Sequence, residues 1–332
     1  MPLDELLIAI ALCAYVVGAL ALLLYFFSRE TWARNLGAAL AILGCTAQFV
    51  QLVVRWESTH VWPLLNLYGS LSLFAAMSVA IYIGFAFRYR IWFAGGFVLA
   101  LAAIFLAYGV TWYEGTMPPV PSLQSYWAKI HVPIVVSSYA AFLVSFVFSC
   151  VYLLKYYAEQ SFSGRRVLAT AAAEAGYRSG AGELSVNPMM GAVTDAGGID
   201  FGRGIARETP AIAAAASSGS PVARWLLSLP TLAQLDVITY RAVAIGLPLI
   251  SVGIITGAMW AKEAWGAYWQ WDPKETAALF SWIIYLAYMH LHTRHAWRGV
   301  RTSWVSVIGF LSIIFCYLGV NIWISGLHSY KM

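Results

Sequence analysis

The sequence predicts an all-α protein, a polytopic transmembrane helical bundle of about eight helices. Of its 332 residues, 61% are hydrophobic and 11% are charged, and the mean hydropathy is +0.72. Apolar runs recur at lengths near the roughly 20 residues that cross a hydrocarbon core of about 30 Å. One soluble core could not bury this many apolar side chains, so the chain must use lipid as its solvent.

The first run is interpreted as a helix of the mature protein and not as a signal peptide. It is long, follows the acids Asp4 and Glu5, and lacks a convincing small-residue cleavage site. The eight predicted spans cover residues 3–27, 36–55, 67–87, 91–110, 133–155, 237–259, 274–293 and 303–324.

The connection between the fifth and sixth spans, residues 156–235, has a different composition. It is rich in Ala, Gly and Ser and has no regular apolar period, which predicts a partly disordered cytoplasmic insertion. This connection separates membrane helices one to five, in residues 1–155, from helices six to eight, in residues 236–332.

Most of the 20 lysines and arginines fall in alternate loops and in the long connection. The positive-inside rule therefore predicts a multi-pass protein of the cytoplasmic membrane with both termini on the extracytoplasmic side. This distribution explains the net charge of +5 without nucleic-acid binding. The four cysteines lie inside predicted helices without C-x-x-C spacing, which argues against thiol redox chemistry and covalent haem attachment to this chain.

The extracytoplasmic loop at residues 265–272 is dense in aromatic side chains. Interfacial Trp and Tyr normally form an anchoring belt, but this loop holds more of them than anchoring needs. Trp265 and Trp269 are four residues apart, so a helical turn would place both on one face, with Trp271 close behind and Tyr268 between them. Such a surface suits a large, flat, apolar ligand.

The next residues predict a helix start. Asp272 is a suitable N-cap, Pro273 occupies the first helical position, and Glu275 occupies the third. Asp272 therefore borders the aromatic surface mainly as a helix cap, and we interpret it in that role before any chemical one.

Histidine is the natural protein ligand of haem iron. His131 and His328 lie at predicted helix ends on the side of the aromatic loop, which suggests a bis-histidine site. His290 lies 17 residues after Pro273, about 26 Å along its helix at about 1.5 Å per residue. An ionisable side chain at that depth is a functional candidate, whereas His292 is interpreted as a solvated helix-end residue.

The run WGAYWQWDPKET resembles the WWD signature of haem-handling proteins of cytochrome c biogenesis. The segments LQSYWAKIHVPIVVSSYA, LDVITYRAVAIGLPLISVGIITGAMWAKEAWG and GVNIWISGLHSY narrow the resemblance to the CcsA-type subunit, also called ResC, of the two-component cytochrome c maturation system. These segments cover most of residues 120–155 and 235–330. The first four predicted helices resemble the family only in their general apolar character.

The resemblance implies which residues hold haem b. His131 and His328 would be the axial ligands of haem displayed at the extracytoplasmic face, beside Trp265, Tyr268, Trp269, Trp271 and Asp272. A histidine of the following helix would bind haem within the membrane; the spacing from the signature carries that role to His290, with His292, in the sequence HTR, as its rival.

The resemblance also implies an activity and partners. The chain would deliver haem across the membrane and, with a ResB-type (Ccs1-type) subunit, act as a cytochrome c synthetase, or haem lyase. A reduced apocytochrome c would present its C-x-x-C-H segment for thioether formation. No side chain would be catalytic beyond positioning the haem.

Three other functions remain open on sequence grounds. A haem exporter or chaperone without attachment activity would use the same ligands. A haem-bearing electron-transfer subunit would more often bury paired histidines on neighbouring helices inside the bilayer. A non-haem transporter or flippase would purify without haem.

Overall fold

The computed structural model describes residues 2–113, 121–178, 216–217, 220–320 and 324, with the backbone alone at residue 121 and over 163–178. Among these residues there is no strand, and seven helices are long and apolar enough to cross a membrane. The predicted all-α, polytopic architecture is therefore confirmed. The chain forms two compact units, one of Met1–Tyr152 with Leu235–Met332 and the other of Leu153–Gln234.

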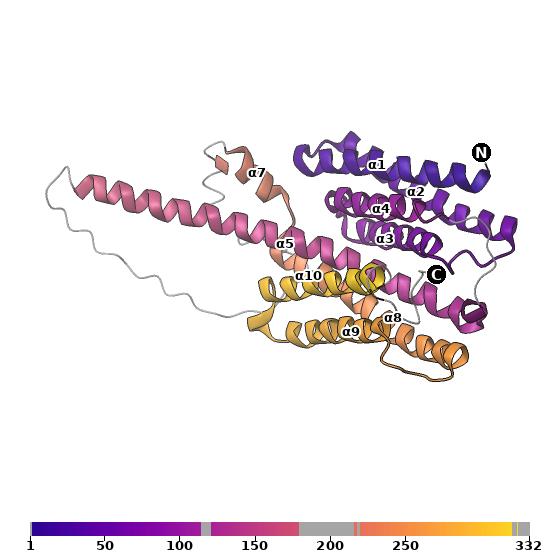
Figure 1. The fold of residues 1–332 in the computed structure, drawn as a ribbon. Helices are drawn as coiled ribbons and strands as arrows, with labels where there is room; N and C mark the ends of the chain where they lie inside the picture. Colours follow the sequence, from indigo (N-terminus) through magenta and orange to yellow (C-terminus); the bar gives the residue numbers. More distant parts are fainter. Residues whose placement is uncertain (1, 114–120, 179–215, 218–219, 321–323, 325–332) are drawn as a thin grey trace. The chain divides into compact units, whose positions relative to one another are not determined.

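Every predicted span corresponds to a helix of the structure (Figure 1). A 3₁₀ turn precedes α4, a five-residue π segment (Phe315–Gly319) follows α10, and a short helix, α7 (Pro221–Ser228), lies in the second unit. The long helices are α1 (Leu3–Ser28), α2 (Thr31–Thr59), α3 (Leu67–Tyr89), α4 (Gly95–Val110), α5 (Tyr126–Arg178), α8 (Leu232–Trp265), α9 (Pro273–His292) and α10 (Val300–Ile314).

Helix α9 is not among the seven apolar helices, although its 20 residues give it a length of about 30 Å. Lys274, Glu275 and two histidines lower its hydropathy. Its length and its place between α8 and α10 make it the eighth helix of the bundle.

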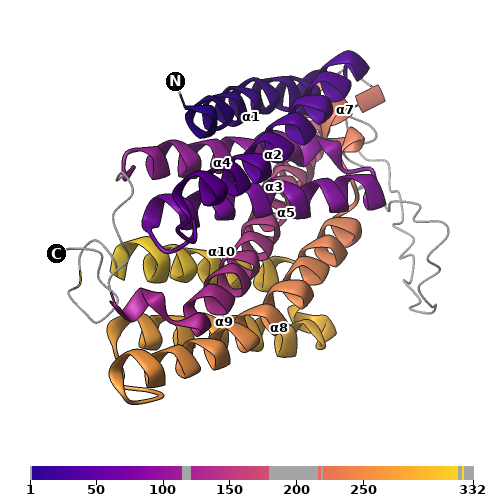
Figure 2. The same cartoon turned by 90° about the vertical axis from the view of Figure 1, so that its right-hand side faces the viewer.

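The first part of α5 lies in the middle of the first unit, between α1–α4 and α8–α10 (Figures 1 and 2). Phe142 of α5 stacks on Tyr285 of α9 with ring centroids 3.6 Å apart, and Ser145 is hydrogen-bonded to Ser306 of α10 at 2.6 Å. In its most apolar stretch α5 is 72% buried, whereas α8 is 33% buried. Helix α5 is therefore the central helix, and α8 buries a smaller share of its residues.

A chain of buried polar groups joins α1, α2 and α3. The Tyr15 hydroxyl donates to Oε1 of Gln48 at 2.7 Å, and Nε2 of Gln48 donates to the carbonyl of Ser72 at 2.8 Å. The Ser72 hydroxyl in turn donates to Oε1 of Gln51 at 3.2 Å. Because hydrocarbon offers no alternative partners, these bonds fix the three helices in one register.

Helix α5 is longer at both ends than the predicted span of residues 133–155. It begins at Tyr126 because the Ser125 hydroxyl accepts the backbone N–H of Trp127 at 3.1 Å, as an N-cap does. It continues to Arg178 through an alanine-rich stretch, and alanine has the highest helix propensity. Residues 156–178 of the predicted connection are therefore helical, and residues 179–215 lie outside the described residues.

Candidate functional site

Glycines on one face of α8 let it approach α5 closely. Gly246, Gly253 and Gly257 are seven and four residues apart, which places them on one side of the helix. A Cβ atom at Gly246 would lie 2.6 Å from Phe142 of α5, and one at Gly257 would lie 2.8 Å from Cε1 of His131. Small residues at these positions are therefore required for the observed contact.

His131 lies in the second turn of α5, inside the helix and not in the loop before it. Its Nδ1 atom is 2.8 Å from the carbonyl oxygen of Gly253. A carbonyl only accepts hydrogen bonds, so Nδ1 carries the proton and the neutral ring keeps its lone pair on Nε2. No hydrogen bond to Nε2 is found among the described residues, and an imidazole oriented in this way is a suitable metal ligand.

The ring of Trp260 lies beside His131, with centroids 5.7 Å apart and an angle of 33° between the planes. Trp260 is only 7% exposed, and its indole N–H donates to the carbonyl of Ser122 at 2.8 Å. A second hydrogen bond joins the segment before α5 to the end of α8: the Ser125 hydroxyl donates to the carboxylate of Glu263 at 2.8 Å. The segment that precedes α5 is thus fastened to the end of α8.

Trp260 belongs to an apolar group that we call the indole cluster. The cluster joins the α2–α3 loop, the start of α5 and the end of α8. Its members are Trp62, Leu65, Leu123, Trp127, Ala128, Trp260, Ala264 and Trp265.

The tryptophan loop, residues 265–272, differs from its predicted form. Helix α8 ends at Trp265, because Gly266 adopts a φ of +82° and its N–H bonds to the carbonyl of Lys262 at 3.0 Å. The expectation that Trp265 and Trp269 share a helical face is therefore wrong. Trp265 joins the indole cluster, with its ring 5.1 Å from that of Trp260.

The remaining aromatic residues of the loop are more exposed. Trp269 contacts Trp271 edge to face at 5.7 Å. Trp271 is 69% exposed and Tyr268 is 55% exposed. The loop therefore has a partly buried residue, Trp265, in the indole cluster, and two exposed residues, Tyr268 and Trp271, that are open to a ligand or a partner.

Asp272 caps α9 as the sequence predicts. Its carboxylate accepts the backbone N–H of Lys274 at 3.1 Å, and the carboxylate of Glu275 accepts the backbone N–H groups of Asp272 and Gln270. The capping box and the proline at the start of the helix are both present. Asp272 is buried, so its first role is to begin α9 and to fix the end of the loop.

A second histidine site lies at the opposite end of α8. Nε2 of His292 is 2.9 Å from the carboxylate of Asp236, and the ring stacks on those of Tyr240 and Tyr288 at 4.5 Å and 5.8 Å. His292 is 8% exposed. The expectation that it is a solvated helix-end residue is therefore wrong, because the turn of α9 directs it toward α8.

The other two histidines of the expected set differ in what the structure describes. His290 is exposed on α9, two residues and more than half a turn from His292. His328 lies outside the described residues. The structure thus places His131 beside Trp260, whose ring contacts Trp265 of the tryptophan loop. It directs His292 and not His290 into the helical bundle.

Sequence reasoning missed four residues that contribute to these sites. Trp62 is about 200 residues from the tryptophan loop in the sequence, so no local pattern joins the two. Asp236 is an acid inside an apolar run, a signal that could have found it. The glycines Gly253 and Gly257 carry a spacing typical of close helix packing in membranes.

Comparison with known proteins gives consistent matches. The family model of the cytochrome C assembly protein matches residues 64–328. The cytochrome c biogenesis protein CcsA of Heterosigma akashiwo is 33% identical over 319 residues, which cover 94% of this chain and 91% of the relative. The CcsA of Gloeobacter violaceus is 33% identical over 324 residues, or 95% of this chain and 92% of the relative.

A solved structure shares the fold. The cytochrome c haem lyase CcmF matches with a TM-score of 0.59 at 14% identity, over 95% of this chain and 46% of that one. This chain therefore spans about half the length of that protein. The family model and the full-length relatives show that the chain belongs to the cytochrome c assembly protein family, as a CcsA-type protein of cytochrome c biogenesis.

Proposed function

We propose that this chain delivers haem b across the membrane and holds it for covalent attachment to apocytochrome c, as one subunit of a cytochrome c synthetase. The observation that carries the proposal is the setting of His131. Its Nδ1 is fixed on the Gly253 carbonyl, its Nε2 keeps a lone pair, and its ring lies against Trp260 of the indole cluster. This combination of an imidazole donor and a flat aromatic surface fits the two needs of haem binding.

The second axial ligand in this proposal is His328, which the family resemblance pairs with His131. Trp265, Tyr268, Trp269 and Trp271 would cover the porphyrin face or edge. The exposure of Tyr268 and Trp271 supports a role at the open side, where an apocytochrome would approach.

The attachment step needs positioning more than acid–base chemistry. Each thiol of the C-x-x-C-H segment adds across one haem vinyl group, so that a sulfur–carbon bond forms and the thiol hydrogen moves to the neighbouring vinyl carbon. No oxidant or reductant is consumed. Holding the thiol and vinyl groups in the reactive geometry can lower such a barrier by up to about 7–11 kcal/mol. A rigidly held His131 would contribute to this positioning by fixing the haem.

For haem within the membrane, the geometry supports His292 better than His290. His292 faces the bundle interior and has a carboxylate, Asp236, that orients its ring. The side chain of His290 is exposed and carries no comparable partner among the described residues. We assign the membrane ligand to this pair of positions and place His292 first.

The proposed partner is a ResB-type (Ccs1-type) membrane subunit. The test is to purify this chain with that partner, add haem and reduced apocytochrome c, and measure thioether formation from the absorbance of the denatured product. Covalent product is expected only with both subunits. Haem transfer without any covalent product would instead identify an exporter or chaperone.

A further inference from the structure

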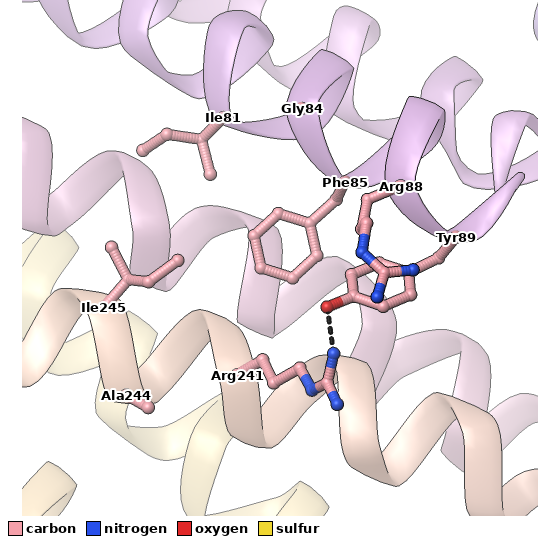
Figure 3. A pocket seen from close by; sticks show the side chains of 8 residues that line it. All are labelled: Ile81, Gly84, Phe85, Arg88, Tyr89, Arg241, Ala244 and Ile245. Atoms are coloured by element: carbon pink, nitrogen blue, oxygen red, sulfur yellow. Dashed lines mark hydrogen bonds between the residues drawn. The ribbon is translucent and has the colours of Figure 1, made fainter. Parts of the chain in front are cut away.

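A groove between α3 and α8 is lined by none of the residues that form the two histidine sites. It has a volume of about 500 Å³, within the range of small-molecule sites. Figure 3 shows its lining, with apolar side chains on one side and basic and phenolic groups on the other. The lining residues are Ile81, Gly84, Phe85, Arg88, Tyr89, Arg241, Ala244 and Ile245.

The polar part of the groove is built around Tyr89. Arg241 donates a hydrogen bond to the Tyr89 hydroxyl, and its guanidinium lies 5.1 Å from the centre of that ring. The guanidinium of Arg88 lies 5.4 Å from the same ring. Within the part of the chain that the structure describes, neither arginine forms an ion pair with a carboxylate. Among the described residues, the two guanidinium groups therefore contact the same tyrosine ring and have no carboxylate partner.

Ordinary helix electrostatics explains only one of these charges. Arg88 lies in the last turn of α3, where the helix dipole favours a cation. Arg241 lies in the N-terminal third of α8, where the dipole gives a cation no stabilisation. Arg241 is also partly buried, so its charge calls for an anionic partner from outside the described chain.

The apolar part of the groove suits an acyl chain. Gly84 is exposed, and a Cβ atom placed there would meet nothing within 4 Å. Ile81 and Phe85 of α3 and Ala244 and Ile245 of α8 line the space around it. From Arg88 to Ile81 the helix rises by about 10 Å, so a headgroup at the arginines would place its chain along this surface.

We propose that this groove binds one anionic phospholipid, with its phosphate held by Arg88, Arg241 and the Tyr89 hydroxyl. The arginines lie at the end of the bundle that contains the α1–α2 and α9–α10 loops, where basic residues are concentrated. Basic pockets between transmembrane helices, on the side of the membrane where basic residues are concentrated, are suited to anionic headgroups. The bound lipid would bridge α3 and α8.

The test uses native mass spectrometry of the purified full-length chain with added dioleoyl phosphatidylglycerol or dioleoyl phosphatidylcholine. We expect selective retention of phosphatidylglycerol, reduced about fivefold by Arg88→Gln or by Arg241→Gln. Gly84→Trp should also reduce retention, because it fills the apolar part and leaves both charges. Arg90→Asn is the control, because it removes a charge at the same end of α3 but does not line the groove.

Three results would overturn the proposal. Equal retention of phosphatidylglycerol by the wild type and the two arginine variants would show that the arginines do not bind it. Displacement by millimolar inorganic phosphate would identify a simple anion site. Displacement by haem, with no phosphatidylglycerol preference, would assign the groove to haem carboxylates.

Discussion

The two ends of α8 hold histidines in opposite ways. At the tryptophan-loop end, His131 donates from Nδ1 to a neutral backbone carbonyl, and Nε2 keeps its lone pair. At the other end, His292 donates from Nε2 to the carboxylate of Asp236. Asp236 and Gly253 are 17 residues apart, about 26 Å along α8, so one helix orients both rings at separations comparable to a hydrocarbon core.

The two histidine settings favour different kinds of ligand binding. A carbonyl fixes the ring of His131 without adding a charge, and nearby indoles supply a broad apolar surface. A carboxylate fixes the ring of His292 and places a negative charge beside it, which favours a ring that is bound to a metal cation. The first arrangement suits display of a ligand beside a loop, and the second suits capture of a cationic centre inside the bundle.

The largest expected effect separates His292 from His290. His292→Ala should remove most haem from the purified complex, because the ring that faces the bundle is lost. His290→Ala should leave haem near the wild-type level, because that side chain is exposed. The measurement is haem content per protein after purification with the partner. Loss of haem in His290→Ala but not in His292→Ala would instead assign the membrane haem ligand to His290.

Asp236→Asn sharpens the same comparison. It keeps the size of the side chain but removes the charge that orients His292. Loss of such an outer partner typically weakens metal binding roughly 10-fold to 100-fold. Haem retention during dilution should fall accordingly, and retention equal to the wild type would show that the pair is only structural.

At the other end, Gly257→Ala should displace His131. The added methyl group would lie 2.8 Å from Cε1 of the ring, so the bond to Gly253 must lengthen or break. We expect haem occupancy at the tryptophan-loop site to fall about tenfold, which is typical when a group that orients a metal-binding histidine is lost. The measurement is the haem spectrum of the complex with His292 intact.

Gly84→Ala is the matched control for this glycine. It makes the same change within a helix, but its Cβ atom would meet no neighbour within 4 Å. Both substitutions raise helix propensity, which alone stabilises by roughly 0.5–1 kcal/mol. Equal haem spectra for the two variants would contradict the role of Gly257 in positioning His131.

The smallest expected effect concerns the cap of α9. Asp272→Ala should lower the free energy of unfolding by about 1 kcal/mol, whereas Asp272→Asn should nearly preserve it, because asparagine is an equally good cap. Thermal unfolding followed by tryptophan fluorescence measures both. A loss of haem that is equal in the two variants would instead indicate that the carboxylate contacts haem directly.

Local sequence signals predicted the parts of the structure that depend on local physics. The eight helices followed from hydropathy, because each must span the same thickness of lipid. The cap at Asp272 followed from three neighbouring residue types. The start of α5 was misplaced by seven residues, although Ser125 carries the N-cap signal.

Contacts between distant segments could not be predicted in this way. Trp62 and Trp265 belong to the same cluster only because the chain folds back on itself. The helical turn predicted for the tryptophan loop does not form, because helix α8 ends just before Gly266. The choice between His290 and His292 depends on which face of α9 meets α8. A single sequence gives the spacing of these residues, but not the rotation of the helix.

The central claim is that His131 ligates haem iron through Nε2. The most direct test is the visible spectrum of the His131→Gly complex, purified with its partner, before and after addition of imidazole. His60→Gly is the control, because His60 is exposed and lies in the α2–α3 loop. We expect loss of the bis-histidine haem spectrum in His131→Gly alone and its return with imidazole. A wild-type spectrum in His131→Gly without imidazole would show that His131 is not an axial ligand.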